Sequence, residues 1–493
     1  MHKLEQLNFD NTFARLPDTF HSRLNPVPLP SPYLISFNAH AAALIDLDAD
    51  QAFRPDFAEY FIGNRLLPGS EPLAMLYAGH QFGQFVPQLG DGRALLLGEI
   101  KNSAGLRWDV QLKGAGQTPY SRHGDGRAVL RSSIREYLCS EAMHGLGIPT
   151  TRALCIVGSD EKIFRETVET AAVITRLAPS HVRFGSFEVF YYRGQREPIA
   201  TLADYVIAHH FPHLCSALGN APDKYARFLQ EVVARTAQLI AQWQAVGFSH
   251  GVMNTDNMSI LGLTFDYGPF GFMEHYDPGY ICNHSDEIGR YAYDQQPQVG
   301  QWNLAALAQA LTPLIAVEDA QNIVDGYGQI FSERYLELMT RKLGLTDFKT
   351  GDLALIESLL EMMRVSELDY TNLFRSLAQF NSAEGELNSA LRDQFIDRAA
   401  FDVWADRYRV RLRGEPVPDA GRKKRMDQVN PKYILRNYLA QIAISKAEQE
   451  RDYSEINRLL DLLSRPYEEQ PGMESYAAPA PEWARKIEVS CSS

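Results

Sequence analysis

A short polar segment carries the side chains best suited to phosphate chemistry. It reads HGVMNTDN over residues 250–257, and Asp266-Tyr267-Gly268 follows it. The amide oxygen of Asn257 and the carboxylate of Asp266 are hard oxygen ligands of the kind that Mg²⁺ and Mn²⁺ prefer. Asp256, beside Asn257, is free to act as a general base or to support the metal from outside its ligand set. The segment therefore predicts a divalent-metal site with a base next to it.

Two features upstream suit a nucleotide. Lys113 lies in a strand-like run and Glu136 in the helical segment after it. Protein kinases hold nucleotide phosphates with such a strand lysine and helix glutamate. The run Gly90-Asp91-Gly92-Arg93 offers backbone N–H groups that can approach phosphate oxygens closely. Each feature also has a plain structural alternative, a glycine hairpin or two unrelated surface charges.

Charge is unevenly distributed along the chain. The 48 basic and 61 acidic residues leave a formal charge of −13, which excludes a globally basic nucleic-acid coat protein. Residues 101–135 are locally basic, and such an island indicates an anion site. Its basic residues are Lys101, Arg107, Lys113, Arg122, Arg127, Arg131 and Arg135, against Asp109 and Asp125. Arg176 and Arg183 add two guanidiniums, which bind phosphate bidentately unless they are solvated surface groups.

The elements that must position these residues are strands first and helices later. The first part of the chain predicts a twisted sheet with one helix, and the part after residue 201 is mainly helical. The predicted strands cover 94–100, 108–114, 153–158 and 171–177, the first two forming a hairpin. The predicted helices cover 129–144, 228–246 closed by Gly247, 303–311, 352–363 and 433–444.

These parts, in this order, resemble the protein-kinase signature set. The chain is more specifically similar to the selenoprotein O family of pseudokinase-like protein adenylyltransferases, known in bacteria as the YdiU family. The resemblance is carried by QLGDGRALLLGE, QLKGAGQTPYSRHGDGRAVLRSSIREYL and HGVMNTDNMSILGLTFDYGPFGFM, and extends to NPKYILRNYLAQIAI and the terminal Cys-Ser-Ser. It implies an α+β, kinase-like bilobal fold: a β-rich N-lobe with one main helix, a mainly helical C-lobe, and N-terminal and C-terminal helical extensions.

The expected organisation has four parts. Residues 1–75 are rich in turn formers and predict an irregular N-terminal extension packed on the body. Residues 76–180 are expected to form the N-lobe, and residues 181–350 the C-lobe with the catalytic loop and metal site. Residues 351–493 are expected to form a C-terminal helical region with a flexible tail.

The resemblance also implies a role for each matching residue. Asp256 is implied as the catalytic base, with Asn257 and Asp266 as metal ligands and Glu136 as the ion-pair partner of Lys113. The implied nucleotide-binding residues are Gly90, Gly92, Arg93, Lys113, Asp125, Gly126, Arg176, Arg183 and Asp266. One departure from kinases at large is informative. Val252 stands where a kinase places its catalytic aspartate, two residues after the histidine.

The family implies an activity that fits this departure. Its members bind ATP in a reversed orientation and transfer AMP to Ser, Thr or Tyr hydroxyls of proteins, with release of pyrophosphate. We therefore predict a protein nucleotidyltransferase that requires Mg²⁺ or Mn²⁺ and uses ATP, with UTP as a second candidate substrate. The resemblance also implies redox-homeostasis proteins as targets, and self-modification. Two alternatives remain open, a kinase-like phosphotransferase and an inactive nucleotide-binding scaffold. Val252 argues against the first, and the retained Lys113, Asn257 and Asp266 argue against the second.

The five cysteines are sparse and widely spaced, which fits neither a disulfide scaffold nor a CxxC metal site. Cys491 occupies the place where some family members carry selenocysteine, and a redox pair with Cys282 is one interpretation; an ordinary tail cysteine is the other. The first twenty residues do not resemble a signal peptide, and no run approaches the ~20 apolar residues that cross a bilayer. We expect a cytoplasmic protein without nucleic-acid or membrane partners.

Overall fold

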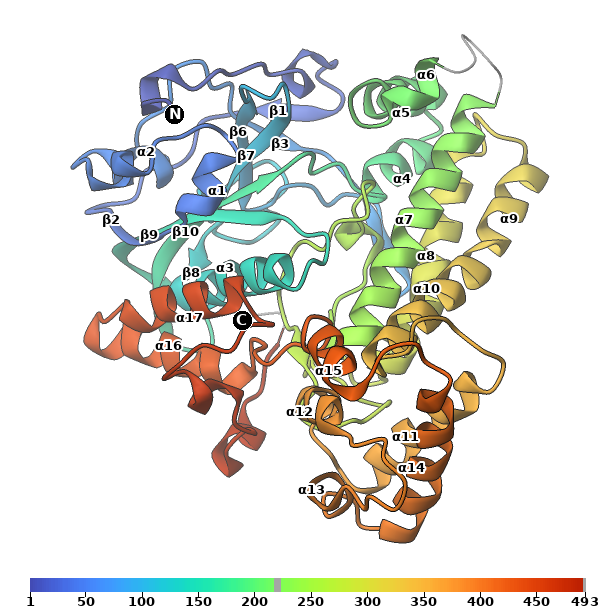
Figure 1. Cartoon of the computed structure of the whole chain (residues 1–493). Coiled ribbons are helices and arrows are strands. Elements are labelled where there is room, and N and C mark those ends of the chain that lie inside the picture. The colour runs from blue at the N-terminus through green and yellow to red at the C-terminus, as the bar shows by residue number, and fades with distance from the viewer. Residues whose placement is uncertain (217–222, 491–493) are drawn as a thin grey trace.

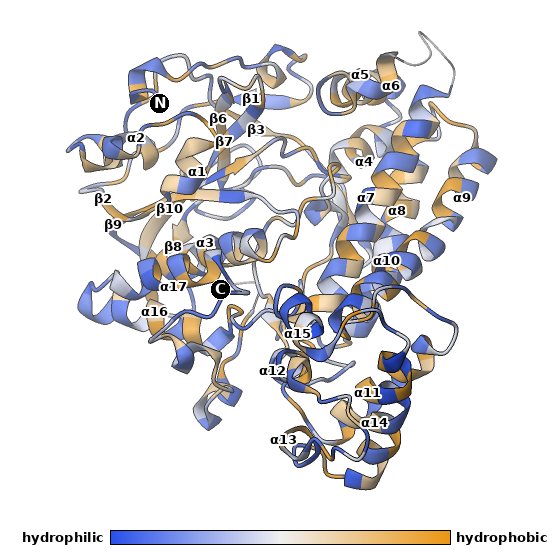
Figure 2. Cartoon of the chain, viewed as in Figure 1, coloured by the Kyte–Doolittle hydropathy of each residue, from blue (hydrophilic) through white to orange (hydrophobic). Residues whose placement is uncertain are grey.

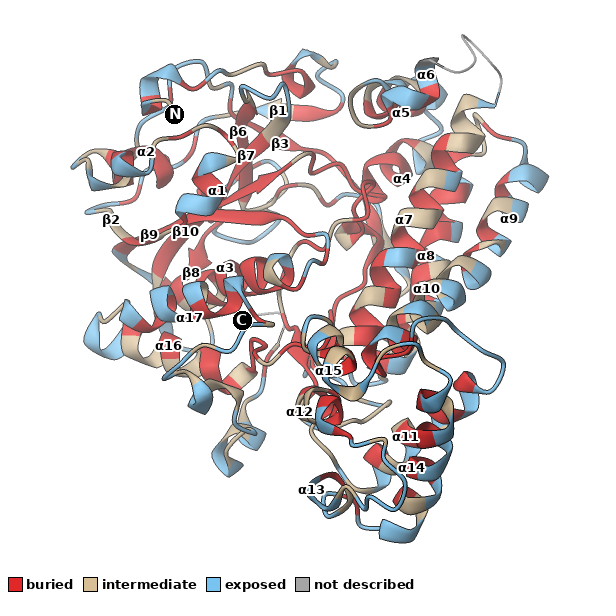
Figure 3. Cartoon of the chain, viewed as in Figure 1, coloured by how far each residue is buried: buried red, intermediate tan, exposed pale blue. Residues whose placement is uncertain are grey.

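The computed structural model describes residues 1–216 and 223–490, and these residues form an α+β structure. A twisted sheet occupies one side of the molecule and long helices occupy the other (Figure 1). The buried residues follow both the sheet and the inner faces of these helices (Figure 3). The α+β class predicted from the sequence is confirmed.

The main sheet has eight strands, and every paired neighbour is antiparallel. The strand order is β1-β3-β6-β7-β10-β9-β2, and β8 pairs with β10. The strands are β1 (His21–Arg23), β2 (Tyr33–Phe37), β3 (Leu73–Met75), β6 (Ala94–Lys101), β7 (Arg107–Lys113), β8 (Ala128–Val129), β9 (Arg152–Phe164) and β10 (Val168–Ala178). Two small sheets pair β4 (Gly79–Gln81) with β5 (Gln84–Val86), and β11 (Phe248–Ser249) with β12 (Gly271–Phe272).

The register of the central strands brings predicted site residues together. Strands β6 and β7 form the predicted hairpin, with Ala94 opposite Lys113. Strand β10 lies on the other side of β7, with Arg176 opposite Gln111. Alternate residues of a strand share a face, and directly paired residues lie side by side on it. Lys113, Gln111 and Arg176 therefore occupy one face of the sheet.

Both faces of the sheet are covered, which explains the apolar character of its strands. Leu95, Leu97 and Val173 join a core cluster with the N-terminal residues, whereas the alternating Leu96 and Ile174 join a cluster built around the main helix. Residues 1–75 were predicted to be irregular, and this prediction is wrong. They contribute strands β1, β2 and β3 to the main sheet. Strands this short carry little periodicity, and only the neighbouring strands stabilise them.

The helices follow the sequence predictions, with shifts at their ends. The predicted helix over 129–144 is α3 (Leu130–Gly145), and α7 ends at Val246 with Gly247 as a left-handed cap. The predicted helix over 433–444 begins later, at Asn437. The helices are α1 (Ala39–Ala43), α2 (Phe57–Phe61), α3, α4 (Gly185–Tyr192), α5 (Arg196–His210), α6 (Pro212–Ser216), α7 (Lys224–Val246), α8 (Gln296–Leu311), α9 (Val317–Asp325), α10 (Tyr327–Lys342), α11 (Asp352–Val365), α12 (Tyr370–Ser376), α13 (Ser389–Arg392), α14 (Arg398–Arg413), α15 (Asp419–Asp427), α16 (Asn437–Glu450) and α17 (Ser454–Ser464).

Helices from distant parts of the chain support the sheet. Helix α3 packs on β9 and β10, and α16 and α17 pack on α3. Helices α11, α12 and α14 form a separate core. Hydrophilic and hydrophobic residues alternate along α14, as in an amphipathic helix (Figure 2). Within the described residues, no helix combines the length and apolar character that crossing a bilayer requires.

One buried cation lies in that separate core. The side chain of Lys342, only 4% exposed, places its ammonium 4.2 Å from the ring centre of Phe374 and 5.3 Å from that of Tyr370. Burial lowers the pKa of Lys342 to about 7, because the charged form is poorly solvated there. The aromatic faces recover part of that loss.

We expect Lys342→Met to raise the free energy of unfolding at pH 7, with an advantage that shrinks as the pH rises. Below pH 7 the lysine is protonated in both states, so the folded state bears the full cost of the buried charge. Above pH 7 the unfolded state binds the extra proton, so the wild type gains stability with pH, by at most about 1.4 kcal/mol per unit. Urea denaturation between pH 7 and 10 measures this, with the exposed Lys424→Met as control. A pH-independent difference would contradict the lowered pKa.

Candidate active site

A polar cleft of about 770 Å³ lies between the sheet and the loop that follows α7. The segment before β6, the 120–127 loop, β7 and β10 line it on one side, and residues 252–257 and 266–269 line it on the other. Lysine and arginine outnumber aspartate among its lining residues. The predicted residues that line it are Gly90, Gly92, Arg93, Lys113, Asp125, Gly126, Arg176, Asp256, Asn257 and Asp266.

The glycine loop before β6 interlocks with a second loop. Gly90 has φ +112°, and a Cβ there would lie 2.6 Å from the ring of Tyr120. A Cβ on Gly92 would lie 2.9 Å from the carbonyl oxygen of Tyr120. Both positions therefore exclude side chains, so that the backbone of this loop lines the cleft. Thr118 ties the loops together by donating its hydroxyl to the Asp91 carbonyl at 2.7 Å.

The second loop contains Asp125 and Gly126. Arg165, from the turn between β9 and β10, donates to both carboxylate oxygens of Asp125 at 2.8 and 2.9 Å. This bidentate pair, together with Arg93, places guanidinium groups on the wall of the cleft. Gly126 has φ +72°, and a Cβ there would lie 2.1 Å from the carbonyl carbon of Gly116. No larger residue fits the loop at that position.

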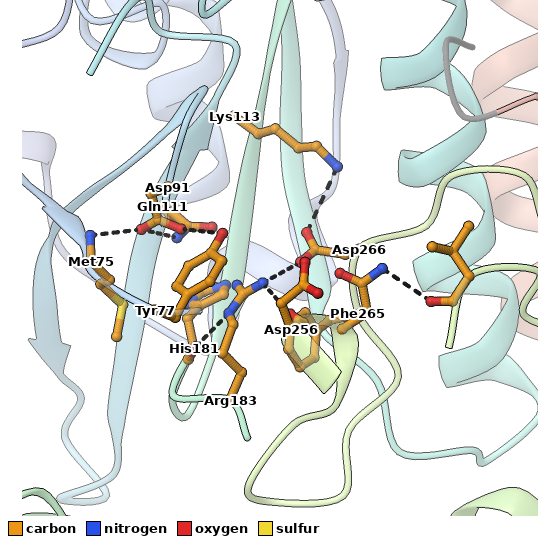
Figure 4. A network of polar contacts seen from close by, with 12 residues as sticks. Met75, Tyr77, Asp91, Gln111, Lys113, His181, Arg183, Asp256, Phe265 and Asp266 are labelled. Carbon is orange, nitrogen blue, oxygen red and sulfur yellow. Dashed lines mark hydrogen bonds and ion pairs between the residues drawn. The ribbon is translucent and has the colours of Figure 1, made fainter. Parts of the chain in front are cut away.

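An ion-pair network connects the sheet with the metal-binding candidate. The ammonium of Lys113 lies 2.5 Å from Oε2 of Glu136. It also lies 3.8 Å from Oδ1 of Asp266 (Figure 4). Arg176 pairs with Glu136 at 3.0 Å and also donates to Asp266 and Gln111. The structure thus brings the predicted Lys113 and Glu136 together on β7 and α3, and adds Arg176 to the pair.

Arg183 lies behind this network rather than on the wall of the cleft. It is 1% exposed, and it donates to Oδ2 of Asp266 at 2.6 Å and to the Asp256 carbonyl at 2.7 Å. Its guanidinium lies between the rings of Tyr77 and Phe265, at 4.3 and 4.6 Å from their centres. The described contacts of Arg183 therefore position the two site aspartates.

Asp266 combines an unusual backbone conformation with a carboxylate that three cations surround. Its φ of +59° is in the left-handed region, which costs a non-glycine residue about 1–2 kcal/mol. Burial opposes ionisation, but Arg176, Arg183 and Lys113 outweigh it and hold the pKa of the Asp266 carboxyl well below its usual range. The charged carboxylate is therefore available throughout the physiological pH range.

Asp256 has one engaged and one free carboxylate oxygen. Gln81 donates its side-chain amide to Oδ2 at 3.2 Å, while Oδ1 is buried and has no hydrogen-bond partner among the described residues. Burial raises the pKa of Asp256 to about 7, and Arg183 partly opposes this shift. A carboxylate that lines a polar cleft and keeps one oxygen without a hydrogen-bond partner is suited to receive a hydroxyl proton.

Asn257 and Asp266 offer oxygen ligands of the kind that Mg²⁺ prefers. The amide nitrogen of Asn257 donates to the Val252 carbonyl at 3.0 Å, which leaves the amide oxygen as its free end. Both residues line the same cleft. No group of three or more His, Cys, Asp or Glu side chains within the described ranges could hold a metal alone. A bound ion would therefore take its other ligands from water and substrate phosphates, as Mg²⁺ usually does.

The predicted redox pair is described only in part. Cys282 is buried and unbridged, and its thiol contacts the Pro269 carbonyl oxygen at 3.1 Å. Burial raises the pKa of Cys282 to about 12, so it is a thiol at neutral pH. Cys491 lies outside the described residues. Close to it in sequence, Val489 accepts a hydrogen bond from the backbone of His284 at 2.9 Å, so the tail passes close to Cys282.

The predicted basic island is dispersed in three dimensions. Lys113, Arg122 and Arg127 line the cleft. Arg107 instead pairs with Asp10, and Arg131 with Glu169. Proximity in sequence therefore overstated the number of charges that share one site.

Comparison with known proteins identifies the family. The family described as "Protein adenylyltransferase SelO" matches residues 3–464, a range that includes every residue of the cleft. The chain belongs to the SelO family. It is 60% identical to the protein nucleotidyltransferase YdiU of Thiobacillus denitrificans, 57% to that of Thioalkalivibrio sulfidiphilus and 56% to that of Myxococcus xanthus, each over 100% of both chains. The predicted family and enzyme class are confirmed.

Sequence reasoning missed two residues in this SelO-family site. Gln81 donates to Asp256, and Arg165 pairs with Asp125. Gln81 precedes the glycine loop in the run YAGHQFGQF, where the flanking glycines were the only local signal. Arg165 lies outside the basic island, and only the pairing of β9 with β10 brings it back to the cleft.

Proposed function

We propose that this chain transfers AMP from ATP to Ser, Thr or Tyr hydroxyls of proteins and releases pyrophosphate. The observation that carries the proposal is Asp256, which lines a cleft rich in cations and has one carboxylate oxygen without a hydrogen-bond partner among the described residues. A base opposite a phosphate-binding wall suits the attack of a hydroxyl on a phosphate group. Names of the relatives, which describe nucleotidyl transfer to protein, support the same reaction.

In this proposal the cations bind the phosphates of the nucleotide. Lys113, Arg93 and Arg176 stabilise the negative charge that develops on the α-phosphate and on the leaving pyrophosphate, which is the main source of catalysis in such transfers. Gly90 and Gly92 let the backbone of their loop approach the nucleotide. Asp125 and Gly126 complete the opposite loop. Arg183 contributes indirectly, because it holds the carboxylate of Asp266 in place.

Asp256 accepts the proton of the attacking hydroxyl. Asp256 lines the cleft, whereas the residue at the kinase base position is Val252, which cannot accept a proton. Asn257 and Asp266 would hold Mg²⁺ or Mn²⁺, and the bound ion would neutralise phosphate oxygens. The kinase-like bilobal arrangement, with lobes over 76–180 and 181–350, belongs to this proposal, as do UTP as a second substrate, self-modification and a cytoplasmic location.

Two labelled nucleotides test the function. The protein is incubated with a bacterial lysate, Mg²⁺ or Mn²⁺, and ATP labelled at the α- or the γ-phosphate. We expect label in protein from the α position only. Label only from the γ position would show a phosphotransferase instead, and metal-dependent nucleotide binding without transfer would show a scaffold.

A further inference from the structure

The small hairpin of β4 and β5 lies outside the main sheet, against the 254–257 loop. Three of its consecutive residues contact three consecutive residues of that loop. The backbone N–H of His80 donates to the hydroxyl of Thr255 at 2.7 Å, and that of Phe82 donates to Oδ1 of Asn254 at 3.2 Å. Between them, the side chain of Gln81 donates to Asp256. The hairpin therefore holds the candidate base and the two residues that precede it.

The outer face of the hairpin is fixed as well. The ring of His80 lies 2.6 Å from the buried carboxylate of Glu188, which also accepts the Thr255 hydroxyl. The ring of Phe85 packs on Tyr192, with 3.8 Å between the ring centres. A side chain that is held by packing and by hydrogen bonds around it keeps its geometry during a reaction. The hairpin of β4 and β5, which carries Gln81, is therefore held in place by contacts with Glu188 and Tyr192.

The hairpin also approaches Asp256 more closely than any side chain would allow. A Cβ on Gly79 would lie 2.8 Å from Oδ1 and 2.9 Å from Cβ of Asp256. Gly79 has no left-handed φ, so alanine would fit its backbone, and the three atoms nearest to its methyl group all belong to Asp256. Two neighbouring residues of the hairpin therefore determine where the carboxylate of Asp256 lies, Gln81 by a hydrogen bond and Gly79 by contact.

We propose that Gln81 is a positioning residue of this active site, which holds Oδ2 of Asp256 and so fixes the carboxylate of the base at the wall of the cleft. This inference rests on the proposed function. Gln81 is suited to the role because its amide is neutral. It orients the carboxylate without cancelling its charge, which an arginine or lysine at the same place would do. Gln81 and Asp256 line the same cleft.

The test compares two glutamines of one hairpin. Gln81→Met keeps the length of the side chain and removes its amide. Gln84→Met makes the same change at the exposed partner of Gln81, which does not line the cleft. Transfer from α-labelled ATP is measured with saturating nucleotide, and nucleotide affinity and melting temperature are measured separately. We expect Gln81→Met to lower kcat by about 10- to 100-fold with unchanged nucleotide affinity, and Gln84→Met to behave as wild type.

A second variant displaces Asp256 by steric contact and leaves the hydrogen bond from Gln81 unaltered in type. Gly79→Ala should also lower kcat and leave nucleotide affinity unchanged, because its methyl group displaces Asp256. Equal kcat values for Gln81→Met and Gln84→Met, with an active wild type, would overturn the positioning role alone. The role is likewise overturned if nucleotide affinity or melting temperature falls together with kcat in Gln81→Met. A wild type that transfers no α-label would overturn the proposed function and this inference with it.

Discussion

Asp266→Asn should reduce nucleotidyl transfer by about 10³-fold, roughly 4 kcal/mol of activation free energy. The asparagine keeps the shape of the side chain but removes the one charge that faces Lys113, Arg176 and Arg183 together. It also removes the only carboxylate of the proposed metal pair. Transfer of α-label at saturating ATP, over a range of Mg²⁺ and Mn²⁺ concentrations, measures the loss.

A control and a second substitution sharpen this result. Asp294→Asn makes the same change at an exposed position away from the cleft and should leave transfer unchanged. Asp266→Ala should in addition lower the free energy of unfolding by about 3–5 kcal/mol, because buried Arg183 would lose its charged partner. Full activity in Asp266→Asn would refute the metal and charge assignments.

Asp256→Asn should lower kcat by about 10²- to 10⁴-fold and leave nucleotide affinity unchanged. The asparagine fills the same space but cannot accept the hydroxyl proton. Nucleotide affinity is expected to persist because Oδ1 has no partner and the phosphate-binding cations lie on the sheet side of the cleft. Single-turnover transfer, measured beside equilibrium nucleotide binding, separates the two effects.

Substitutions of the two aspartates are thus expected to affect different steps. Asp266→Asn should weaken both metal-dependent nucleotide binding and transfer, whereas Asp256→Asn should weaken transfer alone. A parallel loss of nucleotide affinity in Asp256→Asn would contradict its role as a base. Wild-type kcat in that variant would assign proton transfer to another group.

Local sequence patterns were sufficient to predict the long helices and the central hairpin of the fold. The β6–β7 hairpin, α3 and α7 follow from alternating or helical spacing and from glycine at their ends, which are properties of a few adjacent residues. The N-terminal strands were missed because each is three to five residues long. Such strands form only where a partner strand supplies the hydrogen bonds.

In the candidate site, the residue types were sufficient to identify the functional side chains. They did not indicate which other side chains each of them contacts. Lys113, Glu136, Asn257 and Asp266 were chosen from the residues and from the family resemblance, and the structure gathers them around one cleft. Arg183 stays a predicted nucleotide-binding residue, and the structure adds that its buried guanidinium contacts Asp266, Tyr77 and Phe265, which the sequence does not indicate.

From the residues alone, the family, the α+β class and the chemical character of the site could be read, because motifs and periodicity are local. Only the folded chain decided which oxygen of Asp256 is free and which charges share the cleft. Gln81 lies 175 positions before Asp256 and contacts it through packing of the hairpin on the loop. A contact between residues so far apart depends on the positions of whole elements, and no local pattern records those positions.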